Sequence, residues 1–360
     1  MTSNKIFLTG FPGFLASRII PKILQHRRDS ELIALVQEKY FELAKSKIEE
    51  LETKYDYLKN RISMVKGDLT NPDIIESDNF DYKSIKEIFN FAAIYDLRVK
   101  KDLAYKVNIE GTQNLINFAS KCSNLKKFHH ISTCYIAGWA TGIFSELDFD
   151  KGQEFKNFYE ETKFISEKLI RENVGKIPYI IYRPSIVVGD SITGETNKFD
   201  GPYPVIFLIN RLPKLFLMTQ IGSGRNPVNL IHVDYVVDAI AYLSLEEEIY
   251  STYHLCDPNP LTQIELLQLF ASILNKKLIT IKFNSSFIKR LLKWDFVQNL
   301  TGLYPEMIDY FDHNLMFTCD KTLERLEKHN LKPKPFPEYA KTIIDYAIRN
   351  LDQVSKQGLW

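Results

Sequence analysis

Apolar runs of strand length alternate with amphipathic stretches through the first half of this chain of 360 residues. Apolar residues at helical spacing over Leu103–Ser120 and Glu160–Glu172 predict helices. Continuous apolar strands between helices are typical of a parallel sheet that is covered on both faces. The pattern therefore predicts a doubly wound α/β fold that binds its ligands at the carboxyl ends of the strands. The expected strands are Lys5–Thr9, Leu32–Val36, Ile62–Val65, Ile88–Phe91, Lys127–Ser132 and Tyr179–Tyr182.

The regular alternation fades after about residue 184. The segment from Asp190 to Tyr203 is rich in Gly, Pro, Thr and Asp, so it predicts a long loop. Beyond it we expect mostly helices, with short strands such as Thr252–Cys256 and Leu278–Ile281. Val228–Tyr235 is expected to return to the main sheet.

Two structural parts follow from this pattern. The larger, sheet-containing part is expected to hold residues 1–189 and about 226–256. A smaller, helix-rich part, residues 190–225 and 257–360, is expected to cover it and to shape a substrate pocket. Pro21 falls inside the first expected helix, where it predicts a kink rather than a break.

Composition narrows the class of protein. An apolar fraction of 45% and a charged fraction of 25% are ordinary for a globular protein, and a net charge of +1 does not indicate a nucleic-acid partner. The cysteines show no paired spacing, which predicts reduced thiols and a cytoplasmic location. They are Cys122, Cys134, Cys256 and Cys319. We expect neither a signal peptide nor a membrane span, because no run reaches the roughly 20 apolar residues that a span requires. The sequence leaves the oligomeric state open.

The most apolar segment, Pro204–Met218, has two interpretations. A buried core helix is the first. The second is a lid or wall of an apolar pocket that also contacts a membrane. On the second interpretation, a charged residue at Phe207 or Phe216 should impair long apolar substrates more than short ones.

A glycine turn follows the first strand. Gly10 comes directly after Lys5–Thr9, and a helical pattern begins near Phe14 and Leu15. A backbone that approaches a pyrophosphate closely needs residues without Cβ, here Gly10 and Gly13, and the helix N-terminus offers free N–H groups and a partial positive charge. At the first strand of an alternating chain, the spacing Gly-x-x-Gly-x-x-Ala predicts dinucleotide binding. No Gly-Lys-Ser/Thr follows, which excludes a P-loop.

The second and third strands bear on the choice of dinucleotide. The second strand ends in Val36–Gln37–Glu38–Lys39, where Gln37 is neither the acid of an NAD site nor the arginine of an NADP site. Glu38 and Lys39 could serve either cofactor, and NADP is favoured over NAD. Asp68, in Gly67–Asp68–Leu69, is positioned to accept a hydrogen bond from the adenine amine, although a turn-forming aspartate is an equally good interpretation.

A second constellation lies further along the chain. The fifth strand ends at Ser132–Thr133, and Tyr159 precedes Lys163 by four residues at the start of a helix, so both face the same side. The same spacing occurs at Tyr55/Lys59 and Tyr82/Lys86, but those pairs precede the third and fourth strands and have no hydroxyl partner of this kind.

This constellation can move a proton. A lysine ammonium within about 4–6 Å would lower the tyrosine pKa from about 10 by about 1–3. Tyr159 could then protonate an oxygen as hydride arrives at its carbon, a role worth about 10²–10⁴-fold in rate. Thr133 would hydrogen-bond that oxygen, and Lys163 could also hold the nicotinamide ribose. Asn108 would support a proton-relay water behind Lys163; a helix-packing amide is the alternative.

Two other reactive residue types have structural interpretations. His129 and His130 have no cysteine or carboxylate at ligand spacing, so we expect a packed strand pair and no metal site. Cys134 would alternate to the opposite face from Thr133 if the strand continues, which favours a buried small residue over a covalent catalyst.

Together these motifs resemble the extended short-chain dehydrogenase/reductase superfamily, which has a Rossmann fold. The stretches Ser132–Gly138 and Arg183–Glu195 are most similar to its thioester reductase and fatty acyl-CoA reductase branch, the male-sterility type. The resemblance implies that Thr133, rather than Ser132, is the catalytic hydroxyl. The matching motifs are Thr9–Ala16, Gly67–Thr70, Phe91–Ala93, Asn108–Asn114, Ile131–Gly138, Tyr159–Lys163, Arg183–Gly189 and Val233–Asp238. The cofactor site that it implies adds Leu69, Ala92, Ala93, Pro184, Ile186 and Val187 to the residues above.

The resemblance further implies an NADPH-dependent oxidoreductase of an acyl thioester or the corresponding aldehyde, with CoA or an acyl carrier as partner. Gln37 departs from the arginine usual in NADPH-using members, and no carrier or adenylation domain is recognised. A nucleotide-sugar epimerase or dehydratase with bound NAD, or a hydroxysteroid-type dehydrogenase, is the alternative enzyme. A dinucleotide-sensing scaffold is the non-enzymatic alternative, which the intact Thr133, Tyr159 and Lys163 disfavour.

Overall fold

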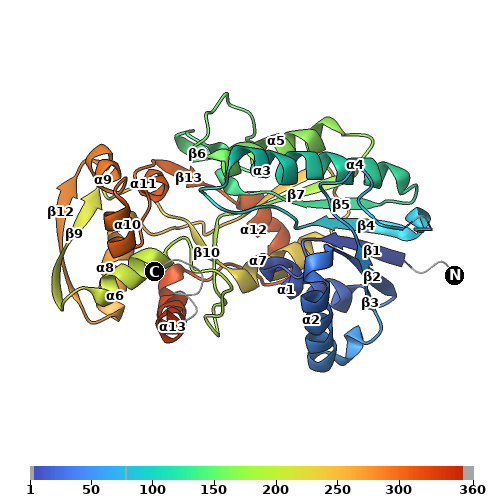
Figure 1. Ribbon diagram of the computed structural model, residues 1–360, viewed down its shortest axis with the longest axis horizontal. Coiled ribbons are helices and arrows are strands. Elements are labelled where there is room, and N and C mark those ends of the chain that lie inside the picture. The colour runs from blue at the N-terminus through green and yellow to red at the C-terminus, as the bar shows by residue number, and fades with distance from the viewer. Residues whose placement is uncertain (1–3, 78, 352–360) are drawn as a thin grey trace.

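The computed structural model describes residues 4–77 and 79–351, and its larger part is built on a parallel sheet of seven strands (Figure 1). The strand order is β11-β7-β5-β4-β1-β2-β3. Successive strands are added outward on one side from β1 to β3 and on the other side from β4 to β11. The order of the strands therefore reverses between β1 and β4, and this switch point is where doubly wound sheets bind ligands. The strands are β1 (Asn4–Thr9), β2 (Ser30–Val36), β3 (Ile62–Lys66), β4 (Ile85–Asn90), β5 (Lys127–Ile131), β7 (Tyr179–Pro184) and β11 (Ser251–Leu255). The predicted doubly wound fold is confirmed.

Helices cover both faces of this sheet (Figure 1). One face carries α1 (Phe14–His26), α2 (Phe41–Lys54), α7 (Val233–Leu243) and α12 (Asp320–Glu327). The other carries α3 (Lys101–Ala104), a π-helical segment η4 (Tyr105–Glu110), α4 (Gly111–Lys121) and α5 (Phe158–Glu172). The helix expected over Leu103–Ser120 is therefore present, with a π-helical segment inside it.

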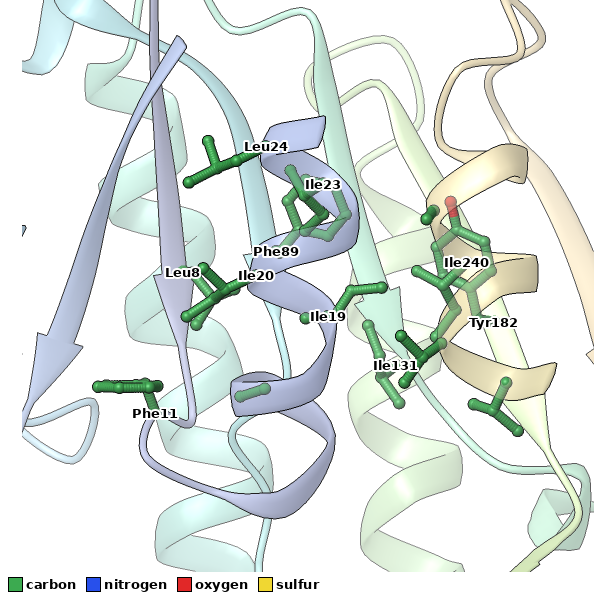
Figure 2. Packing of buried hydrophobic residues seen from close by; sticks show 14 of the residues in the cluster. Leu8, Phe11, Ile19, Ile20, Ile23, Leu24, Phe89, Ile131, Tyr182 and Ile240 are labelled. Carbon is green, nitrogen blue, oxygen red and sulfur yellow. The ribbon is translucent and has the colours of Figure 1, made fainter. Parts of the chain in front are cut away.

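The α1 helix shows why this sequence packs on the sheet. Its apolar residues recur every three or four positions, so Ile19, Ile20 and Ile23 share one face. Figure 2 shows that face against Leu8 of β1 and Phe89 of β4. The helix continues through Pro21 without a break, and the expected kink there stays a prediction.

A second core forms at the other end of the molecule. There α6 (Tyr203–Arg211), α8 (Gln263–Ile273) and α13 (Phe336–Arg349) enclose one apolar cluster. A separate sheet of β9 (Leu215–Ile221) and β12 (Lys277–Phe283) packs on its outer side (Figure 1). The short helices α9 (Ser285–Leu291), α10 (Asp295–Thr301) and α11 (Pro305–Phe311) pack around a smaller cluster. The helix-rich part expected from the sequence is present.

Val228–Tyr235 does not join the main sheet, contrary to expectation. Its strand β10 (Leu230–His232) pairs with β8 (Ile186–Val188) in a separate two-stranded sheet, and α7 begins at Val233. The position beside β7 is already taken by β11, which explains the difference. A further small sheet pairs β13 (Leu315–Phe317) with β6 (Gly142–Phe144).

The apolar segment Pro204–Met218 is not a single helix. It consists of most of α6, a break at Leu212–Pro213 and the first part of β9. Pro213 cannot donate a helical hydrogen bond and disfavours helical geometry in the residue before it, which explains the break. Phe207 and Phe216 are buried in the second core. A charge at either position would therefore disrupt folding and lower activity with long and short substrates alike. These substitutions cannot test whether the segment is a lid.

The four cysteines are free and buried. Among residues 4–77 and 79–351, no helix is both long enough and apolar enough to cross a bilayer.

Candidate active site

The glycine turn lies between β1 and α1. Gly10 has a φ of +88°, and a Cβ on it would lie 2.7 Å from the backbone carbon of Phe91, which follows β4. Glycine is therefore required for both the backbone conformation and the close approach. At the start of α1, Gly13 is the N-cap; no side chain caps the helix and no acidic residue occupies its first turn. The N–H groups near Phe14 and Leu15 can thus receive a phosphate, and this turn fits a dinucleotide.

The carboxyl ends of β2 and β3 meet beside this turn. Gln37 donates from Nε2 to Oδ2 of Asp68 at 2.9 Å, and the Thr70 amide donates to Oδ1 at 2.8 Å. Burial alone would raise the pKa of Asp68, but these hydrogen bonds lower it below its ordinary value. Asp68 is therefore a fixed carboxylate. The Leu69 side chain is buried in the sheet core, so the backbone of that residue is the part available to a ligand.

The remaining expected cofactor residues follow β4 and β7. Ala92 is half-buried and Ala93 is exposed just beyond β4. Pro184 is the last residue of β7, and the half-buried Ile186 and Val187 open β8. The structure thus places these residues at the carboxyl edge of the sheet, which is also the edge where Gly10 and Gly13 lie.

Thr133 lies just after β5, at the same edge. It caps a 3₁₀ turn, η5 (Cys134–Ala137), by accepting from the Tyr135 amide at 3.2 Å, and its hydroxyl donates to the Pro184 carbonyl at 3.2 Å. The strand does not continue to Cys134, so the expected alternation of faces does not apply. Cys134 is nevertheless a buried small residue, whose thiol donates to the Arg183 carbonyl at 2.9 Å.

Lys163 is anchored beneath this edge. It is buried one helical turn after Tyr159 on α5, and its Nζ donates to the Ile131 carbonyl at 2.6 Å. Burial lowers the Lys163 pKa to about 8, against the opposing effect of the Glu167 carboxylate. Its ammonium is therefore still the main form at neutral pH.

Tyr159 faces Thr133 across the end of β5. Burial raises the pKa of its phenol above the usual range, and a hydrogen bond with the Thr133 side chain opposes that rise. We expected the Lys163 ammonium to lower this pKa; that prediction is wrong, because desolvation of the almost fully buried phenol is the largest influence and raises the pKa. Tyr159 therefore keeps its proton at neutral pH, as a proton donor must.

Asn108 lies in the π-helical segment η4. Its Oδ1 accepts from the Ile94 amide at 2.8 Å, and its Nδ2 donates to the Thr162 hydroxyl at 2.9 Å. These contacts join the loop after β4 to α5, which agrees with a packing amide. π-helical segments are frequent at functional sites, which is compatible with the proton-relay role of Asn108. That role stays a prediction.

Several residues near Tyr159 carry no recognisable motif. The Tyr95 ring meets the Tyr159 ring edge-on at 5.0 Å. From the helix-rich part, Tyr310 on α11 accepts from Asn157 Nδ2 at 2.8 Å, and Asn157 is the N-cap of α5. Only the tertiary fold brings these residues together, so no local sequence signal could have identified them.

The two histidines of β5 pack within the sheet, as predicted. His129 contacts the Tyr182 hydroxyl at 3.0 Å, and His130 contacts Nδ2 of Asn90 at 3.2 Å. Burial lowers their pKa values to about 4 and about 3, respectively. In the part of the chain that the structure describes, no three His, Cys, Asp or Glu side chains are grouped so that they could hold a metal ion.

Comparison with known proteins identifies the family. The family model described as "Male sterility protein", an NAD-binding domain, matches residues 8–240. The chain belongs to this family. The expected place in the thioester and fatty acyl-CoA reductase branch of the extended short-chain dehydrogenases/reductases is thereby confirmed, as is NAD(P) binding.

Two curated proteins that are similar in sequence to this chain are reductases. The alcohol-forming fatty acyl-CoA reductase of Simmondsia chinensis is 24% identical over 336 residues, covering 71% of this chain and 66% of that protein. Fatty acyl-CoA reductase wat of Drosophila melanogaster is 24% identical over 275 residues, covering 65% of this chain and 53% of that protein. The chain thus spans about half to two thirds of the length of these relatives.

Solved structures share the fold. The terminal R domain of the myxalamid PKS-NRPS pathway has a TM-score of 0.79 at 22% identity, covering 96% of this chain and 91% of that chain. A thiolation-reductase di-domain from an archaeal non-ribosomal peptide synthetase has a TM-score of 0.75 at 19% identity, covering 98% of this chain and 76% of that chain. Both likenesses span the Rossmann part and the helix-rich part.

Proposed function

We propose that this protein uses NADPH to reduce an acyl thioester, carried on CoA or an acyl carrier, or the corresponding aldehyde. The observation that carries the proposal is the pairing of the Thr133 hydroxyl with a buried, protonated Tyr159 at the same sheet edge as the uncapped glycine turn. The names of the relatives, fatty acyl-CoA reductases, support the substrate class.

The residues have distinct roles in this reaction. The bound reduced dinucleotide supplies hydride to the carbonyl carbon. Tyr159 donates its proton to the carbonyl oxygen, and Thr133 turns its hydroxyl from the Pro184 carbonyl toward the same oxygen. Lys163 uses one N–H at the Ile131 carbonyl and keeps two for a ribose hydroxyl and for Tyr159. With a thioester, loss of the thiol then leaves an aldehyde.

The preference for NADPH rests on local charge. At the end of β2, Gln37 is neutral, and the Glu38 carboxylate is already paired with Lys66 at 2.6 Å. The exposed Lys39 lies next in sequence and can meet a 2′-phosphate. We therefore expect a higher kcat/KM with NADPH than with NADH. An equal or higher value with NADH would contradict this part of the proposal.

The test is an assay of nicotinamide absorbance with purified protein. Long-chain acyl-CoA and the matching aldehyde are offered separately, with NADPH and then with NADH. Loss of NADPH absorbance together with release of free thiol is the expected result for thioester reduction. Turnover of the aldehyde alone would restrict the function to aldehyde reduction. Inactivity with both substrates, in protein that purifies with bound NAD, would favour the nucleotide-sugar enzymes instead.

The free cysteines further favour a reducing compartment such as the cytoplasm.

A further inference from the structure

One face of the β9–β12 sheet is apolar and exposed to solvent. In its parallel register Leu215 lies opposite Lys277 and Leu217 lies opposite Ile279, so alternate residues share one face. The opposite face, with Phe216, packs on the second core. The exposed face continues into α9 through the stacked rings of Phe283 and Phe287, 5.7 Å apart. We call this surface the β9–β12 patch; it consists of Leu215, Leu217, Ile279, Ile281, Phe283 and Phe287, each 37–61% exposed.

The chain just after the patch adds further apolar side chains. Leu291 ends α9, Trp294 follows it, and Phe296 and Leu300 lie one turn apart on α10. Trp294 and Phe296 are 66% and 73% exposed, which is unusual for large aromatic residues. Exposed apolar surface of this extent marks a contact surface rather than ordinary solvent-facing structure.

The charged residues in the segments that form the patch are nearly all basic. The chain as a whole is nearly balanced, with 46 basic and 45 acidic residues. In residues 211–221 and 276–301, however, Asp295 is the single acid. The basic residues there are Arg211, Lys214, Lys276, Lys277, Lys282, Lys289, Arg290 and Lys293. Lys289 pairs with Asp309, and Lys276 donates to backbone carbonyls at the end of α6. Lys214, Lys277, Lys282, Arg290 and Lys293 are exposed.

We propose that the β9–β12 patch, with the segment through α10, docks on the surface of a membrane that contains anionic lipid. Surface-lying membrane segments combine Trp, Phe and Leu on one side with many Lys and Arg residues, which is the composition found here. Lysine is instead depleted at protein–protein interfaces, so a partner protein fits less well. Anionic headgroups attract such basic residues within a Debye length.

The position of the patch connects it to the candidate active site. Ile288 and Leu292, on the inner side of the α9 segment, pack against Ile308 of α11. On the same helix α11, Tyr310 reaches Asn157 beside Tyr159. A membrane on the patch would therefore lie against the part of the molecule that touches the site. The proposal itself rests on the surface alone and does not require the proposed reaction.

The test is flotation of the whole protein with vesicles of phosphatidylcholine, with and without phosphatidylglycerol. We expect binding to the anionic vesicles that weakens as salt is added. Ile279→Thr/Ile281→Thr keeps β-branched residues on the strand, and Lys282→Glu/Lys293→Glu reverses two exposed charges. Each double variant should lower the vesicle partition coefficient by about tenfold or more.

Matched controls change the same chemistry elsewhere. Leu43→Thr/Leu147→Thr replaces two other exposed leucines, 61% and 91% exposed, and Lys45→Glu/Lys83→Glu reverses two other exposed lysines. Both controls should bind like the original protein. The Tyr159→Phe variant should also bind, so failure of the proposed reaction would leave this result intact.

Three outcomes would overturn the proposal. The first is a folded protein that ignores anionic vesicles. The second is patch variants that bind as well as the controls. The third is a dimer that Ile279→Thr/Ile281→Thr dissociates, since a second copy would then cover the patch.

Discussion

At the scale of single residues, the reaction depends on one phenol. Tyr159→Phe removes the proton donor but keeps the ring that packs edge-on against Tyr95. We expect kcat to fall by about 10²-fold or more, with dinucleotide affinity unchanged. Steady-state kinetics and a dinucleotide titration check the two halves of this prediction.

Tyr82 supplies a matched control. It also precedes a lysine, Lys86, by four residues, but its ring packs against Phe80 and Phe118 in the core. Tyr82→Phe should therefore leave kcat unchanged. Full activity in Tyr159→Phe, or equal losses in both variants, would remove Tyr159 from the mechanism.

His130 links single-residue chemistry to the pH dependence of stability. Burial and the neighbouring Lys163 ammonium lower its pKa to about 3 in the folded chain, compared with 6.5 for an ordinary histidine. Between these values the unfolded chain binds the extra proton, so acid favours unfolding. The histidine thus contributes a stability loss of about 1.4 kcal/mol per pH unit as pH falls from about 6.5.

His130→Asn should remove that contribution. Its free energy of unfolding, measured by denaturant titration at several pH values, should fall less steeply below pH 6.5 than that of the original protein. The slope is the readout, because the substitution also changes packing at every pH. Parallel curves for His130→Asn and the original protein would refute the argument.

At the scale of elements, the turn between β1 and α1 requires glycine at position 10 for a reason that the φ angle alone does not explain. Gly10 and Gly175 have nearly the same φ, +88° and +83°, but a Cβ on Gly175 would meet nothing within 4 Å. Gly175→Ala should cost about 1 kcal/mol, from backbone conformation alone. Gly10→Ala should cost more, because its Cβ would meet the backbone of Phe91, and it should also weaken dinucleotide binding. Denaturant unfolding and dinucleotide titration of both variants measure the difference, and equal losses of stability would contradict the proposed clash.

Elements with a strong local pattern could be predicted from the sequence. β1, β2 and β7 contain continuous apolar runs, and these runs directly indicate a sheet buried on both faces. β9 was missed, and β10 was assigned to the wrong sheet, because their pairing partners, β12 and β8, are chosen by tertiary packing rather than by local pattern. Short apolar runs do not distinguish a helix from a strand, which explains the single helix expected over Pro204–Met218.

The candidate site divides in the same way. Gly10 and Thr133 follow the ends of β1 and β5, and Tyr159 lies in the first turn of α5, so the sequence could predict their meeting at one edge of the sheet. The depth of burial at Tyr159 could not be predicted, and burial is what sets the direction of its pKa. Tyr310 comes from a helix far along the chain and has no motif, so only the folded structure reveals it.

At the scale of the whole molecule, Tyr310 is where the helix-rich part reaches the catalytic helix. Asn157 caps α5 through Oδ1, which accepts from the Glu160 amide at 3.0 Å, and its Nδ2 donates to the Tyr310 hydroxyl at 2.8 Å. One side chain therefore both starts the helix that carries Tyr159 and binds the other part of the protein. This arrangement couples the stability of α5 to the docking of α11.

A double-mutant cycle measures that coupling. Asn157→Ser keeps a capping oxygen and removes the amide donor, while Tyr310→Phe removes the acceptor and keeps the ring against Tyr135. We expect a coupling free energy of unfolding of about 0.5–1.5 kcal/mol, the range of one hydrogen bond between groups in contact. Hydrogen exchange should also quicken in the first turn of α5 when Tyr310 alone is changed, because the cap loses its support. Losses that add to within about 0.3 kcal/mol, with unchanged exchange in α5, would show that the two parts fold without this link.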